Sequence, residues 1–209
     1  MPELRNVAVA GGTGRLDHHV VQSLLSPQFR SNFRDIVLLT RDRNEVAVKL
    51  ESEGATIRLY NEDNMVESLK DIDILVNTLA SKGHHYKLKL VEALPKSSVK
   101  LYFPSEFGVD HYKNTFKQDQ WDTKRAMYET VKNEALSVQM CLVFIGLFME
   151  LSIGPWFGYD TRSGRYTCVG LATVPSSYTS MADASKIVAA LATLPYSKIP
   201  PPLRISVAT

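Results

Sequence analysis

The stretch VAVAGGTGRLD, Val7–Asp17, decides the fold of this chain. Its first four residues are apolar, which is typical of a buried strand, and a turn with three glycines follows at once. After Gly14, apolar residues from Leu16 to Leu25 recur at the spacing of an amphipathic helix. A strand, a glycine-rich turn and a helix in this order predict a loop whose backbone N–H groups and helix N-terminus bind the pyrophosphate of a dinucleotide.

One position departs from the full fingerprint, because Asp17 stands where G-x-x-G-x-x-G would place its last glycine. That glycine permits close packing of the helix on the strand, whereas aspartate adds a Cβ and a negative charge. A carboxylate about 6 Å from a pyrophosphate, at an effective dielectric of about 20, would cost about 3 kcal/mol per charge pair, roughly a hundredfold in affinity. Alternatively, the side chain turns outward and favours the helix N-terminus, or Arg15 or His18 offsets its charge.

The length and composition predict one globular domain over residues 1–209. A hydrophobic content of 44% suffices for a core, and a net charge of +2 favours neither nucleic acid nor membrane surfaces as partners. The two cysteines, Cys141 and Cys168, have apolar or strand-like surroundings and are expected to be reduced. We expect no signal peptide before the first strand and no membrane span, and hence a cytoplasmic protein.

Strand and helix patterns alternate along the whole chain. Apolar strands that alternate with helices favour a parallel sheet covered on both faces, and therefore a doubly wound α/β Rossmann fold. The expected strands are Val7–Ala10, Ile36–Leu39, Ala55–Leu59, Ile72–Leu79, Val99–Phe103, Met140–Ile145 and Leu203–Val207. The expected helices after the first are Val46–Glu53, Asn64–Lys70, His84–Leu94, Trp121–Leu136 and Met181–Leu194.

A second run, LYFPSEFGVD at Leu101–Asp110, ends the fifth strand. With the glycine loop, LLTRD (Leu38–Asp42), FIGLFMEL (Phe144–Leu151) and SYTSMADASKIVAALATLP (Ser177–Pro195), it resembles the NmrA-like and isoflavone-reductase-like family of atypical short-chain dehydrogenase/reductases. The resemblance spans nearly the whole chain, and FPSEFG is its most specific part. It implies a Rossmann fold, a preference for NADP(H) and a smaller substrate domain built mostly from the C-terminal part.

Members of the family usually continue well beyond the position of Thr209, with residues that form much of the substrate-pocket wall. We therefore interpret the Gly/Pro-rich and aromatic stretch Gly154–Tyr178 as a remnant of the substrate-side region. A shortened substrate side would leave apolar surface uncovered, which predicts a homodimer or a protein partner.

The candidate cofactor residues follow four of the expected strands, at the sheet edge where ligands bind. Arg41 stands where an NAD-type site would carry an acidic residue, and it offers a cation for a 2′-phosphate; a solvated arginine is the alternative. The resemblance implies that Phe107 packs near the nicotinamide. The full set is Gly11, Thr13, Gly14, Arg15, Leu16, Arg41, Thr78, Leu79, Ser105, Phe107 and Lys124.

Two catalytic candidates lie on the long helix near residue 121. The resemblance implies that Lys124 contacts the nicotinamide ribose and assists proton delivery. The rival pair is Tyr128 and Lys132, a Y-x-x-x-K spacing that puts both side chains on one helix face, with Tyr as proton donor. A third interpretation places both lysines on a solvated helix face.

Histidines and Glu106 carry weaker signals. The adjacent pairs His18-His19 and His84-His85 point in different directions on a helix and have no further ligand at metal spacing, so we expect no metal site. We expect His111 to be a surface loop residue and Glu106 to cap or pair locally.

The leading hypothesis is an NADPH-dependent reductase of a small aromatic or polyketide-like metabolite in secondary metabolism, with hydride supplied by nicotinamide C4. One alternative is a non-enzymatic NADP(H)-sensing regulator of the NmrA type. Another is a relative that no longer binds a dinucleotide and has a non-redox role.

Overall fold

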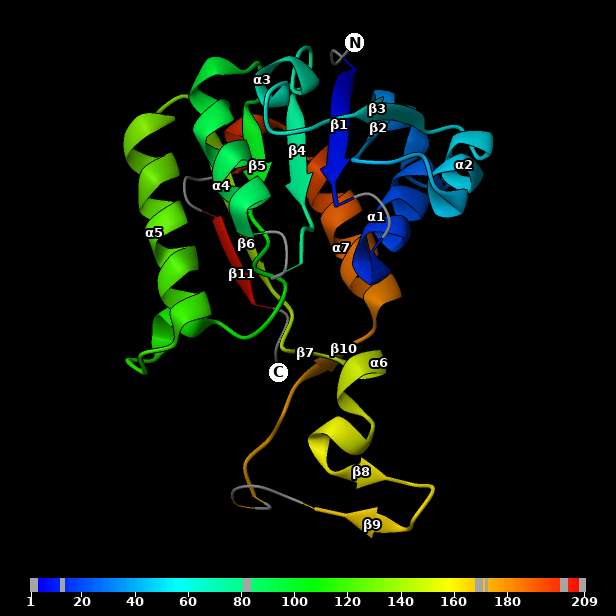
Figure 1. The fold of residues 1–209 in the computed structure, drawn as a ribbon, viewed down its shortest axis with the longest axis vertical. Coiled ribbons are helices and arrows are strands. Elements are labelled where there is room, and N and C mark those ends of the chain that lie inside the picture. Colours follow the sequence, from blue (N-terminus) through cyan, green and yellow to red (C-terminus); the bar gives the residue numbers. More distant parts are fainter. Residues whose placement is uncertain are drawn as a thin grey trace.

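The computed structural model describes residues 4–11, 14–80, 84–167, 171, 173–199 and 203–206, except for the side chains of His84 and Trp156. Its centre is a seven-stranded parallel sheet in the order β11-β6-β5-β4-β1-β2-β3 (Figure 1). The strands are β1 (Arg5–Ala10), β2 (Phe33–Thr40), β3 (Thr56–Leu59), β4 (Ile74–Asn77), β5 (Leu101–Phe103), β6 (Gln139–Phe144) and β11 (Leu203–Ser206). The predicted doubly wound α/β fold is confirmed.

Helices cover both faces of this sheet, because successive strand residues point to opposite sides. Val7 and Val9 pack with α1, α2 and α7, whereas Ala8 and Ala10 pack in a second cluster with residues of α3, α4 and α5. The helices are α1 (Arg15–Leu25), α2 (Glu45–Ser52), α3 (Met65–Ser68), α4 (His84–Ala93), α5 (Asp119–Glu134), α6 (Met149–Ser152) and α7 (Met181–Thr193). None of the helices in these described ranges has the length and apolar character that crossing a membrane requires.

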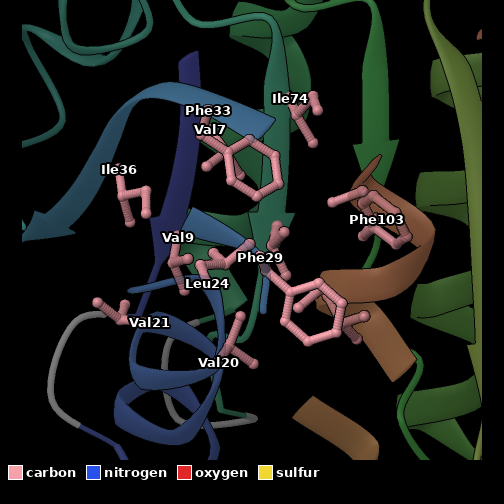
Figure 2. Packing of buried hydrophobic residues seen from close by; sticks show 14 of the residues in the cluster. Val7, Val9, Val20, Val21, Leu24, Phe29, Phe33, Ile36, Ile74 and Phe103 are labelled. Atoms are coloured by element: carbon pink, nitrogen blue, oxygen red, sulfur yellow. The ribbon is translucent and has the colours of Figure 1, made fainter. Parts of the chain in front are cut away.

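The first core cluster fixes α1 against the sheet. Figure 2 shows Val20, Val21 and Leu24 of α1 facing Val7 and Val9 of β1. All five side chains are fully buried, and each buried residue of this size contributes about 1.5–3 kcal/mol relative to exposure. The start of α1 is therefore held firmly beside the end of β1.

A small segment after β6 lies outside the main sheet. It contains β7 (Leu147–Phe148), α6, the antiparallel pair β8 (Tyr159–Asp160) and β9 (Arg165–Tyr166), and β10 (Tyr178–Thr179), which pairs with β7. Figure 1 shows it projecting beyond the carboxyl ends of the strands. The Thr179 hydroxyl donates to the Ile145 carbonyl at 2.7 Å, and Glu150 accepts from the Met181 N–H at 2.9 Å, so both ends of the segment are tied to the domain.

The seven strands and six helices expected from the sequence are all present, although α3, β4 and β5 are shorter than expected. Val207 and Cys168 lie outside the described residues. Cys141 is a free, fully buried thiol whose pKa burial raises to about 12, which keeps it protonated and unreactive.

Replacement of Leu24 by alanine tests the packing of α1. Because Leu24 is fully buried, Leu24→Ala should lower the free energy of unfolding by about 2–5 kcal/mol in urea titrations. Leu136→Ala is the matched control, since Leu136 is 84% exposed and its loss should change stability by less than about 0.5 kcal/mol. Equal effects of the two variants would contradict this packing.

Candidate functional site

A cleft of about 660 Å³ opens at the carboxyl edge of the sheet, beside the point between β1 and β4 where the strand order reverses. Open α/β sheets bind ligands at this place. The cleft brings together every described residue of the predicted cofactor set: Gly11, Gly14, Arg15, Leu16, Arg41, Thr78, Leu79, Ser105, Phe107 and Lys124. Thr13 lies outside the described residues.

Asp17 points into the turn between β1 and α1. Its side chain is almost fully buried, and Oδ2 accepts a hydrogen bond from the Gly14 N–H at 2.8 Å. A Cβ added at Gly11 would lie 2.7 Å from the same oxygen, and one at Gly14 would lie 2.9 Å from Oδ1. Gly11 also has a backbone φ angle of +142°, which residues other than glycine rarely adopt. The two glycines therefore make room for the carboxylate, and the outward orientation considered for Asp17 is wrong.

Burial is the dominant influence on this carboxyl and raises the pKa of Asp17. The Gly14 N–H and the Thr78 hydroxyl favour the charged form and oppose that rise. Asp17 is thus an acidic group in a site whose dry surroundings disfavour its charge.

Arg41 lies at another wall of the cleft, directly after β2. Its guanidinium carbon lies 4.9 Å from the centre of the Tyr86 ring, a cation–π contact that orients an exposed side chain. Arg43, two residues later, forms an ion pair with Glu51 of α2. Arg41 is therefore the better placed of the two for a ligand phosphate.

Glu106 is the centre of a buried polar cluster at the far wall. It is 4% exposed, and Oε2 lies 3.3 Å from Lys124 Nζ and 3.5 Å from His111 Nδ1. Burial raises the pKa of Glu106, and Lys124 opposes this rise. The local pairing expected of Glu106 is thus an interaction with Lys124 of the cleft wall and with the buried His111.

His111 is 1% exposed, so its expected place on a surface loop is wrong. It lies near Trp121, with ring centres 5.9 Å apart, and meets the Phe144 ring edge-on. Burial, followed by Lys124, lowers the pKa of His111 to about 4, which leaves the imidazole neutral at pH 7.

Lys87 of α4 is a cleft residue that the sequence interpretation missed. It is 4% exposed, and Nζ lies 3.5 Å from the Ser105 hydroxyl. Burial, followed by repulsion from Lys124, lowers the pKa of Lys87 to about 8. The signal was present, since Leu90 and Val91 follow at helical spacing and place Lys87 on the buried face of its helix.

The two lysines proposed for catalysis have different surroundings. Lys124 lines the cleft, whereas Lys132 pairs with Glu129 at 3.4 Å on a face that is more than half exposed. Tyr128 does not line the cleft but an adjoining cavity of about 20 Å³, which shares Lys87, Glu106 and Lys124 with it. The structure thus brings Lys124, and not Lys132, to the cleft. Within the described ranges, no group of three or more metal-binding side chains occurs.

The model of the NmrA-like family matches residues 3–194 of the chain. The chain belongs to the NmrA-like family. Similar proteins include phenylcoumaran benzylic ether reductase TP7 of Nicotiana tabacum, 25% identical over 167 residues, which are 74% of this chain and 54% of that protein. The isoflavone reductase homolog IRL of Zea mays is 30% identical over 114 residues, 52% of this chain and 37% of its own.

The structure of AtPrR2 with NADP+ and (+)pinoresinol has the same fold, with a TM-score of 0.78 and 19% identity. The alignment covers 99% of this NmrA-like chain and 70% of the AtPrR2 chain. The chain spans about half of the length of TP7 and less of IRL. These comparisons establish the family and its fold.

The buried ammonium of Lys87 gives a pH-dependent prediction. Because burial lowers its pKa from 10.5 to about 8, the charged group destabilises the fold at pH 7, and this penalty disappears as pH rises from about 8 toward 10.5. Lys87→Met should therefore raise the free energy of unfolding at pH 7 by about 1–3 kcal/mol, and by clearly less at pH 9.5.

Urea titrations at both pH values would measure this difference. Lys89→Met is the control, because Lys89 lies on the same helix but forms an exposed pair with Glu92. A Lys87→Met effect that is the same at both pH values would contradict the buried charge.

Proposed function

We propose that the chain is an NADPH-dependent reductase of a small aromatic or polyketide-like metabolite. The observation that carries this proposal is the cleft itself, which joins the glycine turn, Arg41 and Lys124 at the carboxyl edge of the sheet. The family and the reductases among its relatives support the same conclusion.

The residues of the cleft suit NADP(H) in most respects. Arg41 offers a guanidinium for the 2′-phosphate, and its contact with Tyr86 holds it in place. The space beside Gly11 and Gly14 is the place where a backbone can approach a pyrophosphate. Asp17 is the one group that opposes an anion there.

NADPH, when bound, would supply the hydride. Lys124 would hold the ribose and deliver a proton to the substrate through its ammonium group, which donates hydrogen bonds to the carbonyl and carboxylate oxygens of Glu106, both at 3.3 Å. Glu106 is a positioning residue, since its carboxylate fixes the lysine at the cleft wall. Phe107, Phe148 and Leu151 supply apolar surface that would exclude water from an aromatic substrate.

A second candidate is an NADP(H)-sensing regulator that binds a protein partner without turnover. The observation that favours it is the apolar surface of the projecting segment, where Phe157, Tyr166 and Val174 are 44%, 66% and 63% exposed. A homodimer through the same surface is the corresponding proposal for the reductase. Consumption of bound NADPH in the presence of phenolic substrates would favour the reductase. Binding of NADPH without its consumption would favour the regulator.

Arg41→Ala tests the choice of cofactor. Loss of a charge-assisted contact with the 2′-phosphate should weaken NADPH binding about 10–100-fold and leave NADH binding nearly unchanged, as measured by calorimetric titration. Arg43→Ala should bind both dinucleotides like the unmodified chain, because Arg43 is paired with Glu51. Equal losses of NADPH and NADH affinity in Arg41→Ala would argue against a 2′-phosphate site.

Lys124→Ala tests the proton-delivery role in NADPH-dependent reduction of phenolic substrates. We expect kcat to fall about 100-fold or more, while Lys132→Ala, which removes an exposed lysine of the same helix, should stay within about twofold. The reverse ranking would transfer the role to Tyr128 and Lys132.

A further inference from the structure

The carboxylate of Asp17 lies at the N-terminus of α1, the part of a helix that commonly binds phosphates. It is 3% exposed and accepts the Gly14 N–H at 2.8 Å, and its oxygens lie 2.7 Å from a Cβ added at Gly11 and 2.9 Å from one added at Gly14. The N–H groups at a helix N-terminus are the ones that bind ligand phosphates. The chain thus places its own anion in the turn.

The hydrogen bond from the Gly14 N–H to Asp17 caps α1, but α7 demonstrates that a cap of this kind does not require a buried carboxylate. Asp183 is the third residue of α7, as Asp17 is of α1, and it forms a reciprocal cap with Ser180 at 2.8 and 3.0 Å. Its side chain remains in solvent, and the cap lowers the pKa of Asp183. Asp17 instead follows a glycine cap and is buried against Gly11 and Thr78. The carboxylate of Asp17 therefore lies inside the turn, whereas that of Asp183 lies in solvent.

We propose that Asp17 takes up one proton when a dinucleotide binds, so that cofactor affinity at this site depends on pH. The inference rests on the proposed function, since it concerns NADPH. One proton from solvent converts the carboxylate to a carboxylic acid, and no other bond changes. Two like charges in one poorly hydrated site disfavour each other, and the protonated acid can donate a hydrogen bond to a phosphate oxygen.

The groups around Asp17 do not remove this conflict. Its hydrogen-bond partners, the Gly14 N–H and the Thr78 hydroxyl, are uncharged. His18 favours the carboxylate but is only partly buried, with Nδ1 3.1 Å from the Gly14 carbonyl. Tyr60, whose pKa burial raises to about 12, stays neutral.

Arg15 and Arg41 line the same cleft and are both exposed. Their charges are screened by solvent, so they cannot fully offset a buried carboxylate beside a pyrophosphate. Lys87, Lys124 and Glu106 also line the cleft, and the last two form an ion pair with each other.

The test is a calorimetric titration of NADPH at pH 6, 7 and 8, in buffers with different ionisation enthalpies, which reports the protons taken up. Asp17→Asn keeps the shape and an acceptor oxygen for the Gly14 N–H but cannot titrate. Relative to this variant, the unmodified chain should take up more protons, approaching about one per NADPH, and its Kd should rise by up to about tenfold per pH unit. The 2′-phosphate contributes equally to both proteins and cancels.

Asp183→Asn is the matched control and should behave like the unmodified chain. Binding by the variants Asp17→Asn or Asp17→Gly alone would overturn both the inference and the proposed function, because the unmodified chain would then exclude NADPH at every pH tested. Equal affinity and equal proton uptake of the unmodified chain and Asp17→Asn would overturn the inference and leave the proposed function intact. If neither the unmodified chain nor Asp17→Asn and Asp17→Gly, each with a cooperative thermal transition, binds NADPH, the proposed function itself fails.

Discussion

The hydrogen bond from the Gly14 N–H to the buried carboxylate of Asp17 is the interaction on which the state of the cleft depends. It closes the turn between β1 and α1 on itself and satisfies an N–H group that a helix N-terminus otherwise leaves free. The packing of Val20, Val21 and Leu24 on the sheet keeps α1 beside β1 although glycine is absent at position 17. The aspartate is tolerated because Gly11 and Gly14 have no Cβ and leave room for its carboxylate in the turn.

The charged side chains of the cleft form two groups, one of exposed arginines and one of lysines around Glu106. Arg15 and Arg41 are cations in contact with solvent, and they suit a ligand that arrives with phosphate charges. In the second group, Lys87 and Lys124 surround the buried Glu106, while His111 stays neutral. One carboxylate therefore faces two lysines in a dry environment. Such an arrangement can hold an ammonium group in a fixed direction, which proton delivery requires.

The sequence predicted the fold well because the relevant signals are local. Alternating apolar strands and amphipathic helices specify the doubly wound sheet, and the sheet brings the residues that follow β1, β2, β4 and β5 to one edge. Arg41 was therefore found from its position after β2, whereas Lys124 of α5 was found through the resemblance to the family. The sequence did not predict the burial of His111, because contacts with Trp121 and Phe144 arise only in the folded chain. The direction of Asp17 depended on the empty space at Gly11 and Gly14, which a linear pattern does not reveal.

The most direct test of this account is a carbon-13 NMR titration of the Asp17 carboxyl group, free and saturated with NADPH, assigned by comparison with Asp17→Asn. We expect a pKa above the ordinary value of 3.8 in the free protein, because the side chain is buried, and a higher pKa in the complex. A pKa at or below 3.8 that NADPH does not move would contradict the account, since the carboxylate would then be a solvated group remote from the ligand.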